Sequence, residues 1–203
     1  MSMINKSDLT PLTLSEIRQM SLDAYDELWS QAEAYGRDVK IYLHWSAGRY
    51  GQFFDDYHIV IDQDGSVYTP VDSFATHLSS TYMRNSGSVN ISLMACVGAS
   101  YDSNDLGENP PTDAQLDAMA QVIAVVAHAL DLTIDINRVM THGEAANNAD
   151  GLTCHEPYGI GTSDPQIRWD LDFLHTGDEY GTGGDTLRGN ANFYANQFYG
   201  NKE

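Results

Sequence analysis

The chain has 203 residues, 42% of them hydrophobic, which is enough for one substantial core and short for two generous domains. Its 29 acidic and 10 basic side chains give a formal net charge of −19. This charge would repel nucleic-acid phosphates and anionic membrane surfaces, so we expect neither as a partner. The two cysteines, Cys96 and Cys154, lie far apart without a C-x-x-C spacing, which excludes a disulfide framework as the source of stability.

The first predicted element is an amphipathic helix from Leu14 to Tyr35. Thr13 and Glu16 have the spacing of a capping box, and apolar residues follow at roughly helical intervals. A strand is expected next, from Val39 to His44, after a breaker that contains a glycine.

A β-hairpin is predicted further along the chain. Tyr57 to Ile61 and Ser66 to Tyr68 have strand patterns, and Asp64-Gly65 between them supplies the turn, because glycine accepts the positive φ that the turn requires. A third apolar run, Asn90 to Val97, suits a strand that is buried on both faces.

The strongest helix signal begins after Thr112 and continues to Leu130. Thr112 and Gln115 form a second capping box, and apolar residues follow at helical spacing. Beyond this helix we expect a short strand from Arg138 to Thr141 and a last helix that opens in the segment from Ile167 to Leu174.

These elements predict an α/β (α+β) fold, in which a central mixed β-sheet is flanked by helices. We expect one main domain over residues 1–175, made of the N-terminal helix and a core over residues 39–174. Residues 176–203 are rich in Gly, Asn and Tyr with little apolar periodicity, so they are predicted to form a tail along the surface or a linker.

Two histidines end predicted strands. His44 closes the run Ile-Tyr-Leu-His, and His142 closes the run Val-Met-Thr-His. A strand end is where a rigid sheet delivers a side chain into a cleft, so the pair could share a metal ion. Spacing alone leaves a second interpretation open, in which each is an ordinary core or surface histidine.

Several short motifs follow one another along residues 39–174. In chain order they are His44-Trp45-Ser46, Tyr57-His58-Ile59-Val60-Ile61, Asp64-Gly65-Ser66-Val67-Tyr68, His77 with Asn85-Ser86-Gly87-Ser88-Val89, His142, and Arg168-Trp169-Asp170. In this order they resemble the type 2 N-acetylmuramoyl-L-alanine amidases, the superfamily that includes phage amidase lysins and peptidoglycan recognition proteins. No single motif is very specific, but their order is.

The resemblance implies a zinc enzyme that cleaves peptidoglycan at the amide bond between N-acetylmuramic acid and L-alanine. It implies that His44, His142 and Asp170 are the metal ligands, which leaves the fourth position for water. It also implies a place beside the metal for Tyr57, whose hydroxyl could bind the metal-bound water or the developing oxyanion. Arg168 stands where a cation would stabilise that oxyanion.

The general base and the substrate contacts are further expectations. Some family members carry a catalytic glutamate in the strand after the Asn-Ser segment, but Ile91-Ser92-Leu93-Met94-Ala95 has no carboxylate. Glu144, two residues after a ligand, is the nearest acidic candidate, and an exposed loop carboxylate is its alternative interpretation. His77 and Asn85 are the candidate substrate-binding residues.

Cys154 and His155 offer a competing third ligand, because both are softer zinc ligands than a carboxylate. Asp170 is favoured over them, since it lies in a basic-x-Asp triplet that matches the family. Adjacent residues on an extended, glycine-flanked loop also tend to point apart.

Other functions stay open at this point. Some relatives have lost a metal ligand and bind muropeptide without cutting it. A zinc hydrolase of another amide, or a structural phage or secretion component, would also be compatible with the sequence. All three ligand positions are filled here, which favours the enzyme.

We expect a monomer that binds peptidoglycan or muropeptide. Residues 1–15 lack the basic and apolar parts of a signal peptide, and no run of about eighteen apolar residues occurs. The sequence therefore predicts synthesis in the cytoplasm, followed by access to the wall through a separate release or export system.

Overall fold

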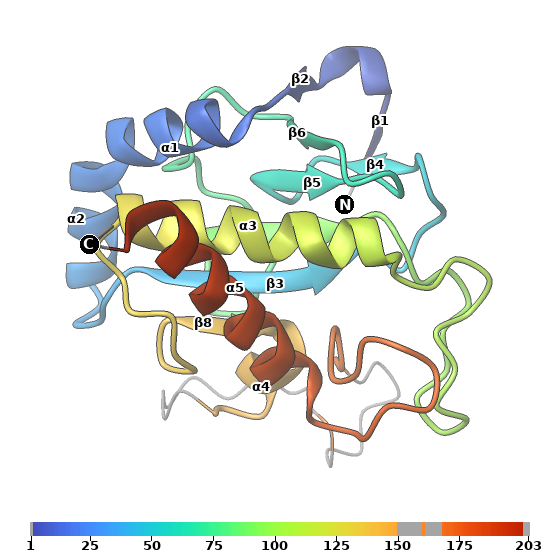
Figure 1. The fold of residues 1–203 in the computed structure, drawn as a ribbon. Helices are drawn as coiled ribbons and strands as arrows, with labels where there is room; N and C mark the ends of the chain where they lie inside the picture. Colours follow the sequence, from blue (N-terminus) through green and yellow to red (C-terminus); the bar gives the residue numbers. More distant parts are fainter. Residues whose placement is uncertain (1, 150–159, 161–167, 201–203) are drawn as a thin grey trace.

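A computed structural model describes residues 2–149, 160 and 168–200 of the chain. Its centre is a six-stranded sheet with the order β2-β6-β5-β7-β3-β8 (Figure 1). The last four strands in this order are parallel, and β6 and β2 are antiparallel additions. The strands are β2 (Thr10–Pro11), β3 (Lys40–Trp45), β5 (Ile59–Ile61), β6 (Val67–Thr69), β7 (Ser88–Leu93) and β8 (Val139–Thr141). The predicted central mixed sheet is confirmed.

A second, two-stranded sheet pairs the N-terminal β1 (Met3–Ile4) with β4 (Phe53–Phe54). A short 3-10 helix, η1 (Lys6–Asp8), joins β1 to β2. The N-terminus is thereby attached to the main body of the fold.

One face of the main sheet is covered by helices, and Figure 1 shows α3 and α5 in front of it with α1 beside α3. Ile41 and Leu43 in β3 share one hydrophobic core with Ile17, Ile123 and Leu187 from the helices. The helices are α1 (Leu14–Asp23), α2 (Tyr25–Glu33), α3 (Asp113–Ala129), α4 (His142–Ala146) and α5 (Gly183–Tyr199). In the described part of the chain, none of them has the length and apolar character needed to cross a membrane.

The opposite face of the central strands is buried and polar. Tyr42 and His44 of β3 lie in register with Asn90 and Ser92 of β7, and all four are buried. Successive residues of a strand point to opposite faces, so the same strands supply the apolar core and this polar face. The central strands of the sheet therefore fix the positions of these polar side chains.

Both predicted capping boxes are confirmed, at Thr13 and at Thr112. The long N-terminal helix differs from its prediction because it divides at Ala24 into α1 and α2. The division lets Ile17 in α1 and Leu28 in α2 both reach the core.

The predicted hairpin is also confirmed. β5 and β6 pair antiparallel, and Gly65 in the turn has φ +81°, a conformation that L side chains rarely adopt. The buried strand predicted from Asn90 to Val97 is present as β7, but it ends at Leu93, before Cys96 takes φ +71°.

The C-terminal part differs most from the sequence prediction. Within the predicted helix of residues 167–174, the described residues 168–174 are not helical, and Leu171 has φ +60°. The expected irregular tail contains α5 instead. Leu187 and Ala191, one helical turn apart, are fully buried in the main core. Their signal was weak because small and polar residues make up most of this helix.

Candidate metal centre

Two parallel strands bring histidines to the same edge of the sheet. His44 lies near the carboxyl end of β3, and His142 follows β8 directly as the first residue of α4. Because β3 and β8 are paired and parallel, these ends meet. Asp170 completes a buried group whose ligand atoms all lie within 4.8 Å of one another. The structure gathers the three residues that the resemblance implied as ligands.

The spacing of this group suits a tetrahedral metal ion. Asp170 Oδ2 lies 3.5 Å from His44 Nδ1 and 3.6 Å from His142 Nδ1. Ligand atoms held at the usual zinc bond lengths and tetrahedral angles are about 3.3–3.4 Å apart. His44 Nδ1 is buried and accepts no hydrogen bond from any residue that the structure describes. Such a nitrogen is costly unless something binds it, so the donor set fits zinc.

Asn90 sets the orientation of the His44 ring. His44 Nε2 lies 3.0 Å from Asn90 Oδ1, an oxygen that only accepts, so the ring proton resides on Nε2. Thr81 Oγ1 donates to the same oxygen over 2.9 Å. The lone pair is therefore on Nδ1, the nitrogen that faces Asp170.

The protonation states of His44 and Asp170 are those that metal binding requires. Burial lowers the pKa of His44, which favours the neutral imidazole. Burial alone would raise the pKa of Asp170, but the imidazoles of His142 and His44 outweigh it and hold that pKa below its ordinary value. The group therefore combines a carboxylate at Asp170 with a neutral imidazole at His44 at neutral pH.

A cavity of about 430 Å³ lies beside the group, a volume typical of small-molecule sites. His142 and Asp170 line it, together with Asp56, Tyr57 and Arg168. Tyr57 and Arg168, which the family resemblance implied as catalytic residues, therefore line the same cavity as these two candidate ligands.

Tyr57 is both a packing residue and a cavity residue. Its ring belongs to a small hydrophobic cluster with Val60 and Met94, and its centroid lies 5.2 Å from that of His44. Burial, and to a lesser degree the charge of Asp170, raises the pKa of Tyr57. The phenol stays protonated at neutral pH and is available as a hydrogen-bond donor.

The two expected substrate-binding residues lie further out. Asn85 lines an adjoining cavity of about 340 Å³ that shares Ser80 and His142 with the first. Asn85 Oδ1 accepts the backbone N–H groups of Ser80 and Thr81, so it also shapes the loop between the cavities. His77 is exposed and lines neither cavity.

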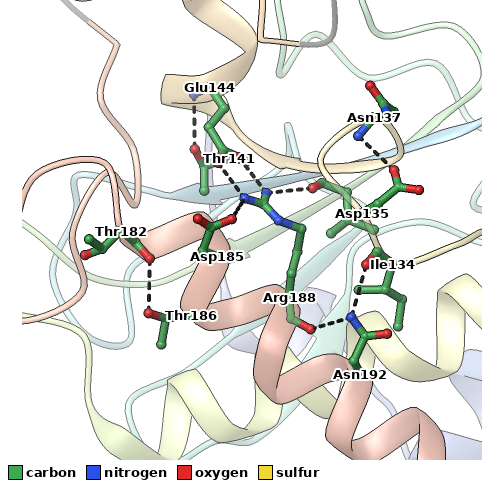
Figure 2. Close-up of polar contacts among 11 residues, drawn as sticks. Ile134, Asp135, Asn137, Thr141, Glu144, Thr182, Asp185, Thr186, Arg188 and Asn192 are labelled. Atoms are coloured by element: carbon green, nitrogen blue, oxygen red, sulfur yellow. Dashed lines mark hydrogen bonds and ion pairs between the residues drawn. The ribbon is translucent and has the colours of Figure 1, made fainter.

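Glu144 occupies a different place from the one expected of a general base. Each of its carboxylate oxygens lies 2.8 Å from a guanidinium nitrogen of Arg188 in α5 (Figure 2). Glu144 Oε2 also accepts the N–H of Thr141 over 2.9 Å, and the residue lines neither cavity. The Glu144 carboxylate therefore belongs to helix α4, is paired with Arg188 and lies outside both cavities.

Three residues near the centre were missed by sequence reasoning. Asn90 had a signal, because a lone amide in an apolar strand needs a buried partner. Trp169 packs edge-on against Trp45 with centroids 4.5 Å apart, which anchors the chain next to Asp170. Asp56 also lines the cavity, and no motif around it in the sequence predicts that location. Cys154 and His155, the competing ligands, lie outside the described residues.

Comparison with known proteins places the chain in a family. The family model described as N-acetylmuramoyl-L-alanine amidase matches residues 24–165, more than half of the chain. The protein belongs to this family. No curated protein sequence matches it significantly.

Several solved structures are similar to this chain at low identity. A Clostridium intestinale endolysin described as an N-acetylmuramoyl-L-alanine amidase is 15% identical, with a TM-score of 0.39 over 52% of this chain and 68% of the other. An endolysin from a Thermus scotoductus bacteriophage is 16% identical, with a TM-score of 0.39 over 60% and 84%. Human PGRP-IBETAC in complex with glycosamyl muramyl pentapeptide is 17% identical, with a TM-score of 0.40 over 64% and 85%.

Proposed function

We propose that this protein is a zinc-dependent amidase that hydrolyses the bond between N-acetylmuramic acid and L-alanine in bacterial peptidoglycan. The observation that carries the proposal is the buried group of His44, His142 and Asp170, which has zinc-compatible spacing beside a cavity. Membership of the amidase family supports the choice of bond. A protein that only binds muropeptide has no need of a complete ligand set.

His44, His142 and Asp170 would hold the ion through two ring nitrogens and one carboxylate oxygen. Bound zinc supplies a water nucleophile with a pKa near neutrality and polarises the substrate carbonyl. Tyr57 keeps its phenolic proton and donates a hydrogen bond to the oxygen that becomes negative. Arg168 adds a fixed positive charge at the cavity wall, and its guanidinium does not release a proton at neutral pH.

Asp56 replaces Glu144 as the candidate for proton transfer. Among the described residues that line the main cavity, Asp56 is the carboxylate outside the ligand group. A general base must reach its proton directly or through one water molecule, and Asp56 lines the cavity beside the candidate ligands, whereas Glu144 lines neither cavity. In this proposal Asp56 takes a proton from the attacking water and delivers it to the departing alanine amine.

The proposed substrate is the wall polymer or the soluble muropeptides derived from it. We propose that the chain acts on the cell wall as a monomer. Its net charge of −19 disfavours attachment to anionic wall polymers, so recognition rests on the cavity and its rim.

The bond that is cut identifies the activity. Purified peptidoglycan is incubated with the protein, and the products are analysed for new alanine amino termini and for new reducing sugars. An amidase releases the first without the second. New reducing ends without alanine amino termini would assign a glycosidase, and intact peptidoglycan that retains bound protein would assign a recognition module.

A further inference from the structure

Helix α5 lies outside the segment that matches the family model, yet it contacts the surroundings of the metal centre. Its Arg188 side chain is only 7% exposed. Arg188 Nη1 donates to the backbone oxygen of Val139 over 3.0 Å, and both terminal nitrogens reach Glu144 over 2.8 Å (Figure 2). The planar guanidinium suits this fork of acceptors, which a lysine could not satisfy together.

These acceptors flank a candidate metal ligand. Val139 belongs to β8 and Glu144 to α4, and His142 lies between them. Glu144 in turn accepts the N–H of Thr141, the residue before His142. One buried side chain of α5 therefore contacts the backbone before this histidine and the carboxylate of the residue two positions after it.

The first turn of α5 contacts the segment that follows Asp170, a second candidate ligand. Gly183 N donates to the oxygen of Asp172 over 3.0 Å. A Cβ added to Gly183 would stand 1.9 Å from the backbone oxygen of Leu171, the residue after Asp170. A Cβ on Gly184 would stand 2.3 Å from the Glu144 carboxylate. Close approach to the backbone therefore requires glycine at Gly183, whereas a side chain at Gly184 would displace the Glu144 carboxylate.

We propose that α5 braces the metal centre, with Arg188, Gly183 and Gly184 as positioning residues that hold His142 and Asp170 at metal-binding separation. The inference rests on the proposed function, because it assumes that these residues bind zinc. It goes further by assigning to a helix beyond the matched family segment a direct effect on zinc affinity. A helix that only stabilised the fold would change the free energy of unfolding, and its substitutions would not lower zinc affinity selectively.

The first test measures the zinc dissociation constant of the full-length protein by competition with a chromogenic chelator. Arg188→Lys keeps the charge but loses the fork, and we expect zinc affinity to fall by at least about tenfold, as for other groups that orient ligands. Asn192→Ala is the matched control, since Asn192 on the same helix donates to the backbone oxygens of Ile134 and Arg188 and not to the Glu144 carboxylate. Its zinc affinity should stay within about twofold of wild type.

The second test perturbs, by steric means, the contact of α5 with the segment that follows Asp170. Gly183→Ala places a methyl group against the Leu171 backbone, whereas Gly189→Ala on the same helix meets nothing within 4 Å. We expect the first substitution to weaken zinc binding by about tenfold or more and the second to leave it unchanged. Cobalt spectra of both variants report ligand geometry independently of catalysis, and only the first should differ from wild type.

The outcomes separate this proposal from the proposed function. Wild-type protein that binds zinc and cuts peptidoglycan, with Arg188→Lys and Gly183→Ala binding zinc equally well, would overturn the brace alone. Equal losses in Asn192→Ala or Gly189→Ala would also overturn it, because they would indicate general destabilisation. Wild-type protein that binds no zinc would overturn both. If Arg188→Lys fails to fold, the glycine pair decides the question.

Discussion

The side chains of His44 and Asn90 form a buried hydrogen bond of 3.0 Å between Nε2 and Oδ1, across 46 residues of sequence. They lie on the same face of the adjacent parallel strands β3 and β7. The bond leaves the lone pair of His44 on Nδ1, the nitrogen that faces Asp170. The sheet therefore sets both the position and the tautomer of a candidate ligand.

Asn90→Ala should weaken zinc binding by about 10–100-fold, because the His44 ring loses the acceptor that orients it. The measurement is chelator competition on folded protein. Ser88→Ala is the control, since Ser88 contacts the Asn90 amide nitrogen over 3.3 Å and does not contact the imidazole. Equal zinc affinity in Asn90→Ala and wild type would mean that packing alone orients His44.

Tyr57→Phe should lower turnover strongly while zinc content stays near that of wild type. Only the hydroxyl is removed, and the ring keeps its place in the hydrophobic cluster. Loss of one donor to an oxyanion costs about 2–4 kcal/mol of transition-state stabilisation. Steady-state kinetics with metal analysis tests this, and wild-type turnover would assign the tyrosine to packing alone.

His58 is predicted to make the protein sensitive to acid. Its Nε2 donates to Thr76 O over 2.8 Å, its Nδ1 accepts the Asn90 N–H over 3.0 Å, and burial lowers its pKa to about 4. The unfolded value is about 6.5, so the unfolded chain takes up the proton first as the pH falls. The stabilisation is complete above about pH 6.5 and is lost toward pH 4, at a cost approaching about 3 kcal/mol.

Urea unfolding of the metal-free protein at several pH values measures this effect. His58→Gln retains a donor and an acceptor but does not titrate. Its free energy of unfolding should depend less steeply on pH between about 6.5 and 4 than that of wild type. Parallel pH dependences would contradict the assignment to His58.

Leu187→Ala should lower the free energy of unfolding by about 2–5 kcal/mol, because this leucine of α5 is fully buried in the main core. Phe193→Ala on the same helix is the control, since Phe193 is 58% exposed. Chemical denaturation compares the two. Similar small effects would mean that residues 183–199 behave as the surface tail that the sequence predicted.

Local chemistry explains which parts of the fold could be predicted. The capping boxes at Thr13 and Thr112 and the turn at Gly65 depend on a few neighbouring residues, so the sequence patterns were sufficient. Helix α5 is different, because its packing depends on distant partners such as Glu144. No local pattern around Arg188 indicates that long-range ion pair.

The candidate site was predictable to a similar extent. Strand ends pointed to His44 and His142, whereas Asp170 was implied only by the family resemblance. Glu144 is near a ligand in sequence, but its carboxylate pairs with Arg188. This ion pair depends on the tertiary structure and cannot be predicted from the local sequence. Asn90 was missed because its partner lies on the neighbouring parallel strand.

Asp170→Ala should lose zinc and activity together, because it removes the carboxylate of the ligand group. Cys154→Ser and His155→Ala should keep both to within a few-fold. If His155→Ala loses zinc while Asp170→Ala keeps it, the ligand set is wrong.

The most direct measurement strips the protein with a chelator, returns zinc stepwise, and follows the release of alanine amino termini from peptidoglycan. We expect no release by the stripped protein, full recovery at about one zinc ion per chain, and none in Asp170→Ala at the same zinc concentration. Undiminished release by the metal-free protein, or full activity of Asp170→Ala without zinc, would contradict a zinc-dependent amidase.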